Sequence, residues 1–79
     1  MDLYYFPACP YCRRVLRFLE GEGSVLLQRV VLRDILAEPD QREVLLRLNH
    51  GEDQVPCLVV DGVPMLESLD IIEYLRSLL

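Results

Sequence analysis

The chain has 79 residues, 52% of them hydrophobic, and a formal net charge of −5. Its length allows one small domain, residues 1–79, with one hydrophobic core. The acidic balance argues against nucleic acid and anionic membrane as partners, and no apolar run approaches the length of a membrane span. Three cysteines cannot all pair, which argues against a secreted disulfide scaffold. Since the N-terminus also lacks the pattern of a signal peptide, we expect a cytoplasmic monomer.

The first predicted elements are a strand and a helix. Residues 2–6 form a short aromatic run that is typical of a buried strand. Residues 10–20 have the spacing of an amphipathic helix, and the Gly-Glu-Gly sequence of residues 21–23 ends it. The apolar stripe of this helix consists of Val15, Leu16, Phe18 and Leu19.

A second strand and a second helix follow. Residues 25–32 are almost all apolar, which predicts a parallel strand covered on both faces. Strand, helix and strand would then form a right-handed crossover. Pro39 begins the next helical pattern, over residues 39–49. The side of this helix that faces the sheet is expected to consist of Val44, Leu45 and Leu48.

The last part of the chain predicts a hairpin and a helix. Residues 57–60 and 63–66 flank an Asp-Gly turn, and Pro64 predicts that the second of these strands lies at the sheet edge. Ser68 is expected to cap a helix that reaches the C-terminus. The apolar row of this helix consists of Leu69, Ile72 and Leu75, with Ile71 beside it. The order β-α-β-α-β-β-α predicts an α/β, thioredoxin-like fold, with a four-stranded mixed sheet flanked by three helices.

A pair of cysteines, in the sequence Cys9-Pro10-Tyr11-Cys12, stands between the first strand and its helix. A Cys-x-x-Cys pair in this setting is typical of a redox site. The helix start has unpaired N–H groups and the positive end of the dipole, so a thiol there loses its proton easily. We therefore expect Cys9 to be an exposed nucleophilic thiol. Cys12 lies one turn further on the same face and can close a disulfide with it, while Pro10 suits the first helical position.

A structural zinc site is the alternative for a cysteine pair, but it normally needs a second pair or histidine partners. Only Cys57 and His50 remain as candidates, so we expect no metal. Cys57 itself has two interpretations. It could lie within reach of the cysteine pair, or it could be a buried strand residue, and we favour the buried position because lone cysteines are usually buried.

The Cys9-Pro10-Tyr11-Cys12 motif is typical of glutaredoxins, and residues 2–78 resemble that family. Residues 67–75, Glu-Ser-Leu-Asp-Ile-Ile-Glu-Tyr-Leu, are similar to a segment of glutathione S-transferase N-terminal domains and of the two-domain bacterial glutaredoxin. The resemblance implies a glutathione-dependent thiol–disulfide oxidoreductase. Its partners would be glutathione, as co-substrate, and disulfide-bearing or glutathionylated proteins, with no permanently bound cofactor.

The resemblance also implies how glutathione is bound. Val55-Pro56 would be joined by a cis peptide bond, and the main chain of Val55 would hold the cysteine of glutathione. Glu67 and Ser68 would hold its γ-glutamyl end, since a helix N-terminus suits a carboxylate. Tyr11 and Pro56 would complete the site.

The sequence differs from these families in two respects. Many glutaredoxins carry a cation where this chain has Phe6, for which Arg13 and Arg14 are expected to substitute in part. The transferase-like segment normally precedes an all-helical second domain, which we do not expect because the chain ends at Leu79.

Three other functions remain open. A redoxin that depends on thioredoxin reductase would not need the Glu67-Ser68 pair. An iron–sulfur carrier would use Cys9 and glutathione from two chains, but the cluster binders that this chain resembles usually have glycine in place of Pro10. A non-catalytic adaptor with this fold would not need an intact Cys9 and Cys12.

Overall fold

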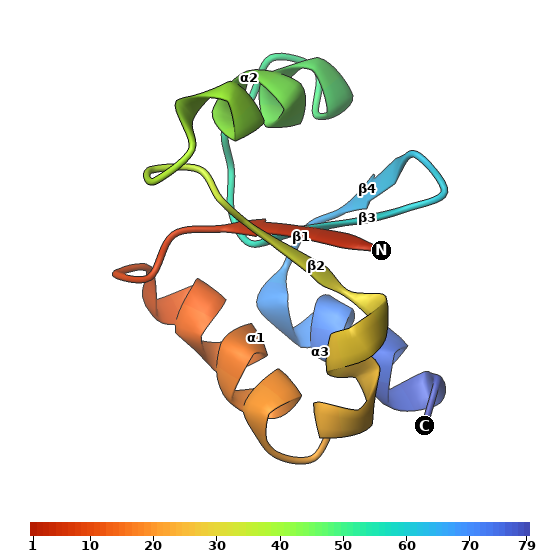
Figure 1. The fold of residues 1–79 in the computed structure, drawn as a ribbon. Helices are drawn as coiled ribbons and strands as arrows, with labels where there is room; N and C mark the ends of the chain where they lie inside the picture. The colour runs from red at the N-terminus through yellow and green to blue at the C-terminus, as the bar shows by residue number, and fades with distance from the viewer.

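The computed structural model describes residues 1–79. The elements in chain order are β1 (Asp2–Tyr5), α1 (Pro10–Glu20), the 3-10 helix η1 (Ser24–Arg29), β2 (Val31–Asp34), α2 (Pro39–Leu48), β3 (Cys57–Val60), β4 (Val63–Met65) and α3 (Ser68–Ser77). The helices α1 and α3 lie side by side on one face of the sheet and α2 covers the other (Figure 1). The predicted α/β, thioredoxin-like order is confirmed, with η1 as an addition.

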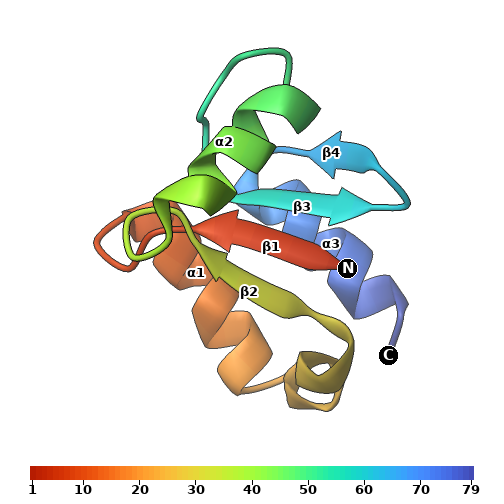
Figure 2. The same ribbon diagram turned by 45° about the horizontal axis from the view of Figure 1, so that its top comes forward.

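The four strands form one mixed sheet in the order β2-β1-β3-β4 (Figure 2). β1 pairs in parallel with β2 and antiparallel with β3, and β4 pairs antiparallel with β3. Because neighbouring residues of a strand point to opposite faces, Leu3 joins the core on the side of α1 and α3, and Tyr4 joins the core beneath α2.

Two apolar clusters therefore hold the layers together. The larger contains Leu3, Val15, Phe18, Leu19, Leu26, Val30, Leu58, Ile71, Ile72 and Leu75. The smaller contains Tyr4, Ile35, Leu45, Cys57 and Val59. The predicted stripes of α1 and α2 both supply buried residues to these clusters. None of the helices combines the length and the apolar character that crossing a membrane requires.

The second strand differs from its prediction in extent and in burial. Residues 24–29 form the helix η1, and only Val31–Asp34 are extended. The side chains of Val31 and Leu32 are 46% and 39% exposed, because β2 is an edge strand and is not covered on both faces. The periodicity of a continuous apolar run cannot distinguish a buried strand from a short helical turn. In this chain the run forms η1, and Leu26 of η1 lies in the core.

The third helix begins one residue earlier than expected. Ser68 is its first helical residue and not its cap, since Glu67 occupies the cap position with φ 70° and accepts the Ile71 N–H at 3.0 Å. The prediction that Leu69 faces the core is also wrong, because its side chain is 65% exposed. The buried face of the helix consists of Ser68, Ile71, Ile72 and Leu75.

The predicted hairpin between β3 and β4 is confirmed. Asp61 and Gly62 have φ angles of 51° and 79°, the positive values that a tight type I′ turn requires at both positions. Pro64 lies on β4, the outermost strand, where its missing N–H removes no ladder hydrogen bond.

The glycine after α1 makes a close contact with the core. A Cβ at Gly23 would lie 2.9 Å from Cδ2 of the buried Phe18 ring, closer than van der Waals contact allows. Gly23→Ala is therefore expected to lower the free energy of unfolding by about 1–3 kcal/mol, as overpacking does. Gly21→Ala is the matched control, because its Cβ would meet the Arg17 carbonyl at an ordinary 3.4 Å. Equal stabilities of the two variants in urea unfolding would contradict the packing assigned to Gly23.

Candidate active site

Cys9 occupies the N-cap position of α1, with extended backbone angles φ −73° and ψ 121°. Its Sγ accepts a hydrogen bond from the Cys12 backbone N–H at 3.4 Å, and Pro10 fills the first helical position as predicted. This N–H and the positive end of the helix dipole both favour a thiolate at Cys9. The expectation of an exposed thiol is wrong: Cys9 is only 8% exposed, because its sulfur turns inward to the helix N–H.

Cys12 is completely buried one turn further along α1. Burial, together with the smaller effect of the neighbouring Cys9 sulfur, raises the pKa of its thiol to about 12. Both cysteines are present as free thiols in this structure. The two cysteines thus have different surroundings: the Cys12 thiol is completely buried, whereas the Cys9 sulfur lies at the start of the helix.

Cys57 lies at 0% exposure in the cluster beneath α2, which confirms the buried interpretation. Burial raises the pKa of its thiol to about 11. Because Cys57 is buried and its pKa is raised, it is not a candidate for exchange chemistry.

Selective alkylation tests this division of the three thiols. Below its pKa a thiol is protonated and unreactive, so Cys12 and Cys57 should resist iodoacetamide until the pH approaches about 12 and about 11, respectively. Near neutral pH the native protein is expected to gain one adduct, on Cys9, and the unfolded protein three. Mass spectrometry of the peptides measures this directly, and early modification of Cys12 would contradict the assignment.

A hollow of about 370 Å³ lies where the start of α1, the loop before β3 and the start of α3 meet. It is lined by Tyr11, Gln54, Val55, Pro56, Glu67 and Ser68. All five residues predicted to bind glutathione are thus brought together, although they come from three separate segments. Cys9 and Cys12 do not line the hollow, but they belong to the same end of α1 as Tyr11. The volume lies within the range of small-ligand sites.

The backbone is unusual on two sides of the hollow. The peptide bond between Val55 and Pro56 is cis, as the resemblance to glutaredoxins implied. Glu67 has a positive φ of 70°, which residues other than glycine rarely adopt. Residues with a positive φ occur often at binding and catalytic sites, so the backbone of Glu67 is a second reason, beside its carboxylate, to treat the hollow as a candidate site.

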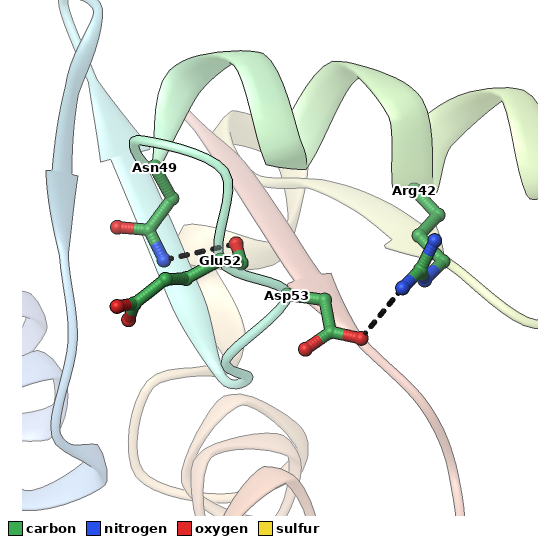
Figure 3. A network of polar contacts seen from close by, with 4 residues as sticks. All are labelled: Arg42, Asn49, Glu52 and Asp53. Atoms are coloured by element: carbon green, nitrogen blue, oxygen red, sulfur yellow. Dashed lines mark hydrogen bonds and ion pairs between the residues drawn. The ribbon is translucent and has the colours of Figure 1, made fainter.

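The loop that leads into the cis proline is anchored both to the first half of α2 and to its C-terminal end (Figure 3). Arg42 forms an ion pair with Asp53 at 2.9 Å, and the Asn49 side-chain amide donates to the Glu52 carbonyl oxygen at 3.2 Å. Asn49 is only 6% exposed, so its hydrogen bond is sheltered from water. These contacts hold the segment that leads to Val55, a residue that lines the hollow.

Gln54 is a lining residue that the sequence analysis did not identify. The one feature of the sequence that could have identified it is its position directly before Val55, a residue that was expected to bind glutathione. Its amide can both donate and accept hydrogen bonds. It therefore adds a neutral polar group to the hollow.

The cations near the site are Arg13 and Arg14, while Phe6 packs against the cluster beneath α2 and supplies no charge. Arg13 Nε donates to the Pro7 carbonyl oxygen at 3.0 Å, so it braces the turn into α1. Arg14 instead reaches a residue of the hollow, Ser68.

No three histidine, cysteine, aspartate or glutamate side chains lie close enough together to hold a metal ion. His50 follows the end of α2 and is exposed.

Comparison with known proteins gives two matches. A family model described as glutathione S-transferase, N-terminal domain, matches residues 3–78, a range that contains the cysteine pair and every residue of the hollow. A curated protein of Streptomyces viridochromogenes, described as an uncharacterized protein in the glnII region, is 38% identical over 48 residues. The aligned part is 61% of this chain but only 40% of that relative, so the chain matches less than half of the relative's length.

Proposed function

Because the chain belongs to the glutathione S-transferase N-terminal domain family, whose members bind glutathione, we propose that it is a glutathione-dependent thiol–disulfide oxidoreductase of the glutaredoxin type. The observation that carries the proposal is the N-cap sulfur of Cys9 at the same helix end that supplies Tyr11 to the hollow. Its substrates are disulfide-bearing and glutathionylated proteins. Glutathione is the co-substrate, and no cofactor is permanently bound.

The reaction begins at the Cys9 sulfur. Its thiolate attacks the glutathione sulfur of a glutathionylated protein, so that a Cys9–glutathione disulfide forms while the original disulfide breaks. The protein leaves as a thiolate and takes up a proton from water. The Cys12 N–H supports this step, because it stabilises the anionic nucleophile from which the attack starts.

Glutathione resolves the intermediate. A second glutathione thiolate attacks the bound glutathione sulfur, which releases oxidised glutathione and restores the Cys9 thiolate. The net reaction converts one protein–glutathione disulfide and one glutathione into a protein thiol and oxidised glutathione. Cys12 is not required for this cycle, which agrees with a buried thiol whose pKa lies at about 12.

Protein disulfides require the second cysteine. When Cys9 has attacked a protein disulfide, Cys12 attacks the Cys9 sulfur, closes a Cys9–Cys12 disulfide and releases the second protein thiolate. The proton of Cys12 passes to that leaving thiolate, directly or through water. Two glutathione molecules then reduce the Cys9–Cys12 disulfide and leave as oxidised glutathione.

The hollow supplies the specificity for glutathione. The main chain of Val55 pairs with the cysteine of the tripeptide in the manner of an added strand. Glu67 accepts hydrogen bonds from the γ-glutamyl ammonium group. The Ser68 hydroxyl and the free N–H groups at the start of α3 bind the γ-glutamyl carboxylate.

A coupled assay tests the function. The protein should reduce a small glutathione mixed disulfide with glutathione and glutathione reductase as the electron source, and it should show little activity with thioredoxin reductase. Activity with thioredoxin reductase alone would favour the thioredoxin-type redoxin instead. Inactivity with both systems, together with a brown colour in anaerobic preparations, would favour the iron–sulfur carrier.

A further inference from the structure

Arg14 connects two residues that line the hollow from different helices. Its Nη1 donates a hydrogen bond to the Ser68 hydroxyl oxygen at 3.3 Å. Its guanidinium carbon lies 5.7 Å from the centre of the Tyr11 ring, within the range of a cation–π contact. Arg14 and Ser68 are 54 positions apart in the sequence, so this one side chain ties the start of α1 to the start of α3.

The hydrogen bond from Arg14 determines how the Ser68 hydroxyl is used. A serine hydroxyl has one proton to donate and two lone pairs, whereas a guanidinium group has donors only. Because Arg14 occupies a lone pair, the hydroxyl proton is left for an acceptor elsewhere. Ser68 lines the hollow and is only 5% exposed, so an anionic group in the hollow is the acceptor that this geometry suits.

Arg14 does not itself line the hollow. The other arginines with side-chain hydrogen bonds bind outside it, at Pro7, Glu43, Asp53 and Glu22. No second cation therefore replaces the contact to Ser68 when Arg14 is removed. The contacts of Arg14 with the residues that line the hollow are those with Ser68 and Tyr11.

We propose that Arg14 is a positioning residue for the carboxylate of the bound γ-glutamyl group. It holds the Ser68 hydroxyl so that the hydroxyl proton faces the hollow. Through its cation–π contact it also holds the Tyr11 ring, which lines the hollow on the side of α1. This inference rests on the proposed glutathione-dependent function. It adds a residue outside the hollow to those that decide the affinity for glutathione.

Two arginine variants on the same helix test the inference. Arg14→Ala should raise KM for a small glutathione mixed disulfide about five- to tenfold, the effect of losing one well-oriented hydrogen bond, while kcat changes by less than about twofold. Arg17→Ala removes the same charge from an exposed position of α1 and should leave both constants unchanged. An unchanged KM in Arg14→Ala, or an equal rise in both variants, would overturn the proposal.

A double-mutant comparison shows whether Arg14 acts through Ser68. In a Ser68→Ala background, Arg14→Ala should raise KM no further, because the group that it orients is absent. Independent, multiplicative effects would show that Arg14 acts by another route and would overturn the proposal. Melting temperatures of all variants are measured in parallel. If Arg14→Ala is unstable, Arg14→Met carries the test, since it keeps the apolar stem but has no donor toward Ser68 and should raise KM by about the same five- to tenfold; an unchanged KM in folded Arg14→Met would overturn the proposal.

The unmodified protein separates failure of this inference from failure of the proposed function. If it reduces no glutathione mixed disulfide at all, the proposed function fails and this inference falls with it. If it turns over normally and only the arginine variants behave unexpectedly, the function stands and the role of Arg14 is wrong.

Discussion

The Cys9→Ser protein is expected to lose all detectable thiol–disulfide exchange. A serine hydroxyl at the N-cap can still accept the Cys12 N–H, so the fold should persist, but it cannot form a disulfide. Neither remaining thiol can substitute, because Cys12 and Cys57 are both completely buried and burial raises the pKa of each. Turnover of a glutathione mixed disulfide, coupled to glutathione reductase, measures the loss.

Cys12→Ser and Cys57→Ser are the matched controls for this variant. Cys12→Ser should retain most of its activity on a glutathione mixed disulfide, since glutathione resolves the Cys9 intermediate, but it should lose reduction of protein disulfides. Cys57→Ser should retain both activities when they are expressed per mole of folded protein. An active Cys9→Ser protein beside an inactive Cys12→Ser protein would reverse the roles assigned to the two cysteines.

The second large effect is expected from Glu67→Gln. The change keeps the shape of the side chain and removes the charge that faces the ammonium group of glutathione. A hydrogen bond to a charged group contributes about 1.5–3 kcal/mol, so kcat/KM for glutathione-dependent turnover should fall about tenfold or more. Reduction of the Cys9–Cys12 disulfide by dithiothreitol should hardly change, because dithiothreitol has no γ-glutamyl group.

Glu73→Gln is the control for Glu67→Gln. Glu73 is an exposed glutamate of α3 that lies outside the hollow, so the same chemical change should leave turnover unaffected. The folded state of both variants is checked by melting. Unchanged glutathione kinetics in a folded Glu67→Gln protein would remove the main support for glutathione specificity, and the thioredoxin-type alternative would then be preferred.

Most of the fold could be predicted because each element has a local signal. Pro10 and Pro39 stand at the first positions of α1 and α2, where proline is favoured. The Asp61-Gly62 pair supplies the positive φ angles of the turn between β3 and β4. These signals act over a few residues, so the sequence alone carries them.

The failures lie where tertiary contacts decide the structure. An apolar run predicted a strand from residue 25, yet residues 24–29 coil into η1 so that Leu26 can enter the core. The exposure of Val31 follows from the place of β2 at the sheet edge, which depends on the order of all four strands. The exposure of Leu69 follows from the packing of α3, whose buried face is centred on Ile71, Ile72 and Leu75 and leaves Leu69 outside it.

The candidate site shows the same division. Residues with a family motif, such as Tyr11 and the Val55-Pro56 pair, were identified in advance and lie together at the hollow. Gln54 belongs to no family motif, and the contact of Arg14 with Ser68 joins residues 54 positions apart, so both depend on the long-range packing of α1, α3 and the loop before β3. Long-range proximity of this kind becomes visible only in three dimensions.

The central claim is that the hollow beside Cys9 holds glutathione, and a structure of the trapped intermediate tests it most directly. Cys12→Ser protein treated with a glutathione mixed disulfide should carry one glutathione on Cys9, because no second thiol can expel it. The account predicts that the γ-glutamyl end then contacts Glu67 and Ser68, while the cysteine of the tripeptide pairs with the main chain of Val55. Glutathione that is bound to Cys9 but directed away from the hollow would contradict it.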